Sequence, residues 1–260
     1  MDNAEGADFE KIASILRTQI ATLVCDAGSR GVALGVSGGI DSAVVCALCA
    51  GCVDTKALIM PESHATSERD TEDAVSVCKA CGVPYEIIDI TRAYDEIVEA
   101  YPHDISSPPL VAANIKPRVR MINLYICANA EQRLVAGTGN RTEIEIGYST
   151  KWGDGAADFF AIGALWKTDV IALARHLGVS EAIVSKPPSA GLMPNQTDEK
   201  EIGGTYDTID AILKRLIVDG IDEEKVSQET GESELVRSLV KRMKRNAHKA
   251  KVPPILEADL

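Results

Sequence analysis

The stretch Gly35-Val-Ser-Gly-Gly-Ile-Asp-Ser42 decides the fold, and it follows directly on a short apolar run, Val32 to Val36. The apolar run predicts a buried strand, and Ile40 to Cys52 predicts a helix. Glycines let a backbone approach a phosphate, the first turn of a helix offers free N–H groups, and the two serines add hydroxyl donors. The octapeptide therefore predicts a phosphate-binding turn, with a tight turn for packing as the alternative.

Asp41 is an unexpected residue in a phosphate-binding turn. Its carboxylate would repel a phosphate unless a cation lay between them, so we expect Asp41 to bind Mg²⁺. The turn is not a Walker A loop, because it has no Gly-Lys-Ser/Thr. It also lacks the G-x-G-x-x-G spacing of a dinucleotide fingerprint. A magnesium-assisted phosphate site of another kind fits the residues better.

Short strands alternate with helices on both sides of this turn. Alternation of this kind predicts an α/β fold: a Rossmann-like parallel sheet with helices on both faces. After a predicted loop from Gly139 to Gly163 the pattern becomes almost wholly helical, which predicts a helical C-terminal extension. We expect one domain over residues 1–260, without a fused glutaminase domain. The predicted strands are 32–36, 57–60, 85–90 and 134–138, and the predicted helices are 9–24, 40–52, 67–80, 114–134, 167–177, 198–218 and 232–251.

The composition describes an acidic globular protein. With 27 Lys+Arg against 39 Asp+Glu the net charge is −12, and only 3 Phe, 2 Trp and 6 Tyr are present. Such a chain is a poor candidate for binding nucleic acid or an anionic membrane surface. The longest uncharged run, Ser42 to Val53, is shorter than the ~20 residues that span a bilayer, and the acidic N-terminus does not resemble a signal peptide. We expect a cytoplasmic protein with no nucleic-acid or membrane partner.

Five of the 7 cysteines are clustered in sequence. A metal or iron–sulfur site is one interpretation of this spacing. The alternative, which we favour, is that the thiols are small apolar groups on two helix faces, because no His or acidic residue is interleaved with them. The clustered residues are Cys46, Cys49, Cys52, Cys78 and Cys81.

A second group of polar residues follows the predicted strand at 134–138. The run Leu134-Val-Ala-Gly-Thr-Gly-Asn-Arg-Thr-Glu143 ends in a carboxylate, and Gly147-Tyr-Ser-Thr-Lys-Trp-Gly-Asp154 comes directly after it. The carboxyl ends of parallel strands meet at one edge of a sheet, where such folds bind ligands. We therefore expect this segment and the Gly35–Ser42 turn to form one site, with a solvated surface loop as the alternative for the segment.

The octapeptide resembles the pyrophosphate loop of the ATP pyrophosphatase superfamily, whose members transfer AMP to a carboxylate or carbonyl. Together with other motifs, this octapeptide makes the chain resemble ammonia-dependent NAD synthetase, most strongly from Val32 to about Asp210. Two of these motifs are the segments Leu134–Glu143 and Gly147–Asp154. The others are Asn114-Ile-Lys-Pro-Arg-Val-Arg-Met, Lys186-Pro-Pro-Ser-Ala-Gly-Leu, Gln196-Thr-Asp-Glu and His248-Lys249.

The resemblance implies roles for matching positions. It implies that Asp41 and Glu143 bind Mg²⁺ and that Asp41, Asp154 and Lys167 take part in catalysis, with Asp154 receiving the ammonium. The implied ATP-binding residues are Gly35, Val36, Ser37, Gly38, Gly39, Ile40, Asp41, Ser42, Thr138, Lys167 and Ser189. The implied deamido-NAD-binding residues are Arg118, Lys151, Asp158, His248 and Lys249.

The resemblance also implies the reaction. A carbon–nitrogen ligase of this family takes ATP, ammonia and deamido-NAD, forms an adenylate, and releases NAD, AMP and pyrophosphate in the last step of NAD biosynthesis. It implies a homodimer, in which one side of the 114–134 helix is buried; packing in the monomer is the alternative. That side carries Met121, Leu124, Tyr125 and Ala128.

The sequence departs from the family pattern at several places. Pro117 stands where Ala is usual, Trp152 and Trp166 replace Tyr, and Ala250 replaces Arg. These changes bear on contacts with the substrate. The segment Lys186 to Asn195 is a candidate lid, or else a plain connection between helices.

The basic run Lys241 to Lys251 has two interpretations, an RNA-binding strip or a helix face. We favour the helix face, with His248 and Lys249 reaching the dinucleotide and Lys241, Arg242, Lys244 and Arg245 solvated.

Two other functions share the phosphate loop. A tRNA-thiolating protein would use C-x-x-C cysteines, but should be basic. A non-catalytic nucleotide sensor would need no second magnesium carboxylate.

Overall fold

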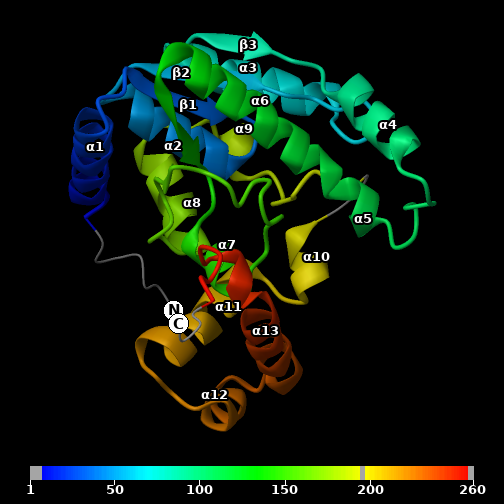
Figure 1. Cartoon of the computed structure of the whole chain (residues 1–260). Coiled ribbons are helices and arrows are strands. Elements are labelled where there is room, and N and C mark those ends of the chain that lie inside the picture. Colours follow the sequence, from blue (N-terminus) through cyan, green and yellow to red (C-terminus); the bar gives the residue numbers. More distant parts are fainter. Residues whose placement is uncertain (1–7, 194–196, 257–260) are drawn as a thin grey trace, which may run out of the picture.

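The computed structural model describes residues 8–193 and 197–256. Its centre is a five-stranded sheet in the order β3-β2-β1-β4-β5, in which every neighbouring pair is parallel. This arrangement confirms the predicted parallel α/β sheet (Figure 1). The strands are β1 (Gly31–Gly35), β2 (Thr55–Ile59), β3 (Tyr85–Ile87), β4 (Arg133–Gly137) and β5 (Phe159–Phe160).

The strand order reverses at β1, and this reversal positions the site. The chain passes from β1 to β2 on one side, whereas β4 pairs with β1 on the other. A crevice at the carboxyl ends of the strands is expected at such a switch point. The turns after β1 and β4 therefore lie together, as the sequence predicts.

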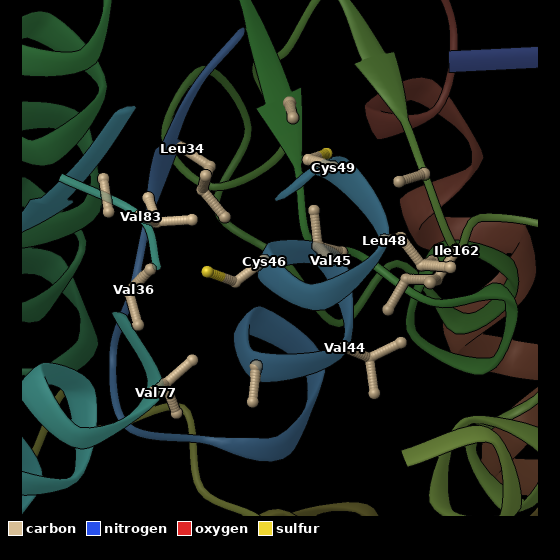
Figure 2. Packing of buried hydrophobic residues seen from close by; sticks show 14 of the residues in the cluster. Leu34, Val36, Val44, Val45, Cys46, Leu48, Cys49, Val77, Val83 and Ile162 are labelled. Carbon is tan, nitrogen blue, oxygen red and sulfur yellow. The ribbon is translucent and has the colours of Figure 1, made fainter. Parts of the chain in front are cut away.

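Helices cover both faces of the sheet. On one face α1, α2 and α8 contact one another and α3 contacts α2 and β2, while α6 crosses β1 and β4 on the other face beside α4. The main apolar cluster lies between the sheet and the first group; Figure 2 shows Leu34 of β1 facing Val45 and Cys46 of α2. The bounds are α1 (Phe9–Asp26), α2 (Ile40–Ala50), α3 (Glu68–Ala80), α4 (Thr91–Ala100), α5 (Leu110–Ala113), α6 (Ile115–Glu131), α8 (Lys167–His176) and α9 (Glu181–Val184).

Two sequence-based assignments need correction. The predicted loop from Gly139 to Gly163 contains α7 (Arg141–Ile146) and β5, because Asn140 and Glu143 form a capping box that starts a short helix. The predicted helix from Asp198 to Val218 is interrupted: α10 (Asp198–Ile202) ends at Gly203, whose φ is +100°. The chain then resumes as α11 (Tyr206–Leu213) and a π-helical turn (Lys214–Val218).

The C-terminal extension is helical, as predicted, and forms its own apolar cluster. Here α12 (Glu223–Thr230) and α13 (Ser233–Asn246) pack together, and a 3₁₀ turn (Ala247–Lys249) follows α13. Their cluster includes Ile146 of α7 and Trp166. This packing brings the last helix next to α7 and hence near the end of β4 (Figure 1).

The clustered cysteines are free thiols that serve as packing groups. Cys46, Cys49 and Cys78 are fully buried in the main cluster, and Cys52 and Cys81 pack against it. Figure 2 shows Cys46 and Cys49 among the aliphatic side chains. Their positions favour the helix-face interpretation over a metal site. Between residues 8 and 256, gaps excepted, none of the helices is long and apolar enough to cross a membrane.

Candidate active site

The turn after β1 is shaped by glycine and by its own serines. Gly38 has φ +78°, and a Cβ there would lie 2.3 Å from the carbonyl oxygen of Asp70. Ser42 Oγ donates to the Gly39 carbonyl (2.9 Å) and accepts from Ser37 N–H (3.2 Å). The N-cap of α2 is Gly39, which has no side chain to occupy the first N–H groups of the helix. A helix start of this kind is suited to an anion.

Asp41 lies in the first turn of α2 and is held from two sides. Its Oδ1 accepts a hydrogen bond from Asn140 Nδ2 at 2.9 Å, and its Oδ2 forms an ion pair with Lys167 Nζ. Lys167, the first residue of α8, is 1% exposed. Burial alone would lower the pKa of Lys167, but the Asp41 and Glu143 carboxylates raise it overall. The lysine therefore stays charged at the loop.

Glu143 completes a triad with Lys167 and Asp41. Its Oε1 lies 4.0 Å from Lys167 Nζ, and its backbone N–H donates to Asn140 Oδ1 (3.0 Å). Burial and the neighbouring Asp41 carboxylate raise the pKa of Glu143 to about 8. Two carboxyl groups thus face one ammonium group at the edge of the sheet.

The donor set of this triad suits magnesium. Mg²⁺ prefers hard oxygen ligands, and it commonly takes one or two carboxylates together with substrate phosphates. Asp41 and Glu143 supply two such carboxylates beside the phosphate-binding turn. Within the described residues no group of three or more His, Cys, Asp or Glu side chains is placed to hold a metal by itself. The site thus fits an ion that phosphate oxygens help to coordinate.

Two buried aspartates support the triad from behind. Asp210 accepts hydrogen bonds from Thr142 Oγ1 (2.5 Å) and Thr168 N–H (2.9 Å), which fixes α7 to α8. Asp198 accepts from the hydroxyls of Tyr148 (3.0 Å) and Tyr206 (3.2 Å). The Tyr206 ring centroid is 5.3 Å from Lys167 Nζ. These contacts leave Lys167 little freedom to move.

Four of the five residues assigned to deamido-NAD gather around the segment after α7. Arg118 Nε donates to the Lys151 carbonyl at 3.3 Å, and Lys151 Nζ lies 3.2 Å from His248 Nδ1. Lys249 Nζ donates to the carbonyls of Gly147 (2.8 Å) and Ser149 (2.6 Å). The C-terminal turn and α6 therefore meet at this loop.

Asp154 and Asp158 occupy different surroundings. Asp154 is exposed, accepts a hydrogen bond from Thr150 N–H (2.8 Å), and interacts electrostatically with Lys249. Asp158 accepts from Val135 N–H in β4 (2.7 Å) and from the Tyr125 hydroxyl (3.3 Å). Asp154 thus belongs to the cluster around Lys151, while the hydrogen bonds of Asp158 attach it to β4 and α6.

The remaining assigned residues lie close to the same edge. Thr138 directly follows β4, two positions before Asn140. Ser189 is exposed and accepts a hydrogen bond from Gly191 N–H (3.1 Å), while the adjacent Ala190 N–H donates to Asp198 (2.8 Å). The candidate lid from Lys186 to Asn195 is described as far as residue 193, and its closure stays a prediction.

The structure explains two departures from the family pattern and corrects one expectation. Pro117 occupies the first turn of α6, where the missing N–H has no helical partner to lose. Trp166 is buried and stacks under Arg141, whose guanidinium lies 4.4 Å from the ring centroid. Arg242 is only partly exposed and donates to the Glu201 carbonyl (2.5 Å), so it is solvated less fully than predicted. Lys241, Lys244 and Arg245 are exposed, as predicted.

Asn140 is a site residue that sequence reasoning missed. It is fully buried, caps α7, and contacts Asp41 across 99 positions of sequence. The spacing Asn140-x-x-Glu143 is a capping-box pattern and was the available signal. Asp198 lies in the Gln196-Thr-Asp-Glu motif, but its sequence neighbours do not indicate that it is buried beside Lys167.

The fold and the site together define an α/β nucleotide-binding enzyme of the adenine nucleotide alpha hydrolase-like class. A family model described as NAD synthase matches residues 11–253. The chain belongs to the NAD synthase family, whose members are ATP-binding ligases of NAD biosynthesis.

Relatives and solved structures agree with this assignment. The chain is 43% identical to an NH(3)-dependent NAD(+) synthetase of Archaeoglobus fulgidus over 95% of this chain and 97% of the relative. It is 41% identical to one of Methanosarcina acetivorans, with 96% and 99% covered.

Among solved structures, an NMN synthetase from Francisella tularensis has a TM-score of 0.86 at 30% identity, covering 97% of this chain and 100% of that one. An NH3-dependent NAD synthetase from Campylobacter jejuni has a TM-score of 0.82 at 32% identity, covering 96% and 100%. These likenesses favour neither tRNA thiolation nor nucleotide sensing.

Proposed function

We propose that this chain converts deamido-NAD to NAD, consuming ATP and ammonia and releasing AMP and pyrophosphate. The observation that carries the proposal is the buried Lys167 between Asp41 and Glu143, directly beside the phosphate-binding turn. The full-length likeness to ammonia-dependent relatives supports it. The acidic composition and the absence of a membrane-spanning helix among the described residues are compatible with a cytoplasmic enzyme.

The first step joins two anions. A carboxylate oxygen of the nicotinate ring attacks the α-phosphorus of ATP, and the bond to the bridging oxygen of pyrophosphate breaks. Repulsion between the anions is reduced by Lys167 and by the N–H groups of the turn, both of which are in place before the substrates bind. Asp41 and Glu143 would hold Mg²⁺, which neutralises phosphate charge when it is bound.

The second step replaces AMP by ammonia. Ammonia attacks the carbonyl carbon of the adenylate, and the carbon–oxygen bond to AMP breaks. At neutral pH most ammonia is protonated, so a carboxylate is needed to attract the cation and assist its deprotonation. Asp154 is exposed within the cluster around Lys151 and is our candidate for this role.

A second candidate product follows from the structural comparison. The NMN synthetase matches this fold with the higher of the two TM-scores, so amidation of the corresponding mononucleotide acid is the alternative reaction. The two reactions differ in the size of the acid that the Lys151 and His248 region must accept. The sequence likeness to the curated relatives favours the dinucleotide.

The two reactions are distinguished by a direct competition. Purified protein with ATP, Mg²⁺ and ammonium would receive equal amounts of deamido-NAD and nicotinic acid mononucleotide, and both amides would be quantified. We expect NAD to dominate and AMP to form in equal amount. Predominant NMN, or turnover only with glutamine, would contradict the proposal. Lys167→Met is the inactive reference, and Lys244→Met, at an exposed position of the basic run, is the matched control.

We also propose that the enzyme is a homodimer joined through α6. On this helix Ile122 is 49% exposed and Ile126 is 61% exposed, one turn apart. Leu124 packs inside the monomer and Ala128 is buried, so the apolar strip differs from the side that the sequence suggested. Light scattering should give twice the chain mass, and Ile126→Glu should give monomers. A monomeric native protein would contradict this proposal.

A further inference from the structure

Lys186 brings a second lysine to the phosphate-binding turn from a different part of the chain. Its ammonium group donates to Asp70 Oδ1 (2.5 Å), Asp73 Oδ2 (2.8 Å) and the Gly38 carbonyl (3.5 Å). An ammonium has three N–H donors, and all three are directed by these contacts. The contact with Gly38 is the longest and is the one most readily exchanged for another acceptor.

The acidic pair that holds Lys186 is fixed by the packing of α3 on the turn. A Cβ placed at Gly38 would lie 2.3 Å from the Asp70 carbonyl oxygen and 3.1 Å from Asp73 Cβ. Asp70 is also part of the capping box with Ser67 that begins α3. The lysine side chain is 28% exposed, so a ligand can reach it. The Lys186 ammonium group therefore lies at the edge of the turn, where a ligand can contact it.

The turn itself has no lysine between Gly35 and Ser42, and Lys167 is engaged by Asp41 and Glu143. When the bond to the α-phosphorus breaks, its electron pair stays on the leaving pyrophosphate. A second lysine beside the turn would supply positive charge for the β- and γ-phosphates in addition to Lys167 and the Mg²⁺ that Asp41 and Glu143 would hold.

We propose that Lys186 binds the β- and γ-phosphates of ATP and stabilises the leaving pyrophosphate, with Asp73 and Asp70 as its positioning residues. A phosphate oxygen replaces the Gly38 carbonyl as the third acceptor, while both aspartates keep their contacts. This inference rests on the proposed function, since it takes ATP to be cleaved between its α- and β-phosphates.

The test compares ligands that differ in their phosphates. Lys186→Met should weaken binding of pyrophosphate and raise the KM for ATP by about tenfold or more, because a charge-assisted hydrogen bond is lost. Binding of AMP, which lacks the β- and γ-phosphates, should be unchanged. Lys186→Arg should restore part of the loss. Lys79→Met, at an exposed position on α3, the helix that carries Asp70 and Asp73, should behave as the native protein.

A merely structural role would give a different result. If Lys186 only anchored its own segment, Lys186→Met would weaken AMP and pyrophosphate equally, and that outcome would overturn the proposal. Unchanged pyrophosphate binding would overturn it too. Calorimetric titration of pyrophosphate needs no turnover. A native protein that binds pyrophosphate through Lys186 but makes no NAD would therefore refute the proposed function and leave only the pyrophosphate-binding role of Lys186 standing.

The positioning part is tested with Asp73, because Asp70 also caps α3. Asp73→Asn should raise the KM for ATP in the native background but add little to Lys186→Met. Fully additive effects on pyrophosphate binding would show that Asp73 does not act through Lys186.

Discussion

The two halves of the site differ in how their charges are held. Around the phosphate-binding turn, side chains bind side chains: Lys167 pairs with Asp41, and buried Asn140 holds both that carboxylate and the start of α7. Around the 147–154 loop, side chains bind the backbone, as Arg118 does at the Lys151 carbonyl. The first half is largely buried, whereas Arg118 and Trp152 are exposed.

This difference indicates a division of labour. Charges fixed by other buried charges are pre-organised and can stabilise a transition state without moving. Exposed cations that rest on carbonyls can exchange those partners for a ligand. Changes in the first half should therefore lower kcat, and changes in the second should raise the KM for the dinucleotide.

The largest effect is expected from the lysine of the triad. Lys167→Met removes the cation that screens two anions, so kcat for AMP formation should fall by at least ~10²-fold. The assay is release of AMP and pyrophosphate at saturating ATP. Lys244→Met, at an exposed position, is the control. A Lys167→Met enzyme with a kcat within tenfold of the native value would contradict the catalytic role of the buried half of the site.

The next effect comes from the shape of the turn. Gly38→Ala places a Cβ 2.3 Å from the Asp70 carbonyl at a φ of +78°, so the turn must shift and ATP binding should be lost. Gly82→Ala is a matched control, because Gly82 has φ +65° but nothing within 4 Å of its Cβ position. Its backbone strain of roughly 1–2 kcal/mol should appear in thermal unfolding without a change in the KM for ATP. Equal KM values for the two variants would contradict the structure of the turn.

Substitutions in the half of the site around the 147–154 loop should change the KM for deamido-NAD. Lys151→Met removes a partly buried cation that contacts His248, so the KM for deamido-NAD should rise by about tenfold while that for ATP stays unchanged. Steady-state kinetics with each substrate varied in turn separates the two constants. If the KM for ATP rises as well, the two halves are not separate.

The smallest effect on activity is expected from a change at Tyr206, whose ring packs against Lys167 of the triad. Tyr206→Phe deletes the hydroxyl that donates to buried Asp198 at 3.2 Å. Denaturant unfolding should show a loss of about 1 kcal/mol. Tyr148 still donates to Asp198, so kcat should change little. A large loss of kcat would move Tyr206 into the catalytic machinery.

Local patterns predicted the sheet and the position of the site. The strand, the glycine turn and the helix around Gly35 to Ser42 have distinct signals, because buried strands and capped helices leave short-range patterns. Short elements such as α7 and α9 have too few residues for a periodicity. The break at Gly203 did have a signal, a glycine pair, but the apolar period on either side obscured it.

Contacts between distant residues could not be predicted in the same way. Asp41 meets Asn140 and Lys186 meets Asp73 across 99 and 113 positions, and no local pattern records such partners. The resemblance implies roles for Glu143 and Lys167, whereas only the structure shows that the Lys167 ammonium lies between Asp41 and Glu143. Asp158 accepts hydrogen bonds from β4 and α6, and its contact with deamido-NAD stays a prediction.

Transfer of isotopically labelled oxygen tests the central claim, that the carboxylate of deamido-NAD is adenylated, most directly. Deamido-NAD labelled in both carboxylate oxygens would be converted in one turnover, and the products would be weighed by mass spectrometry. The account predicts one labelled oxygen in AMP and none in pyrophosphate. Label in pyrophosphate or inorganic phosphate, or unlabelled AMP formed together with NAD, would contradict it.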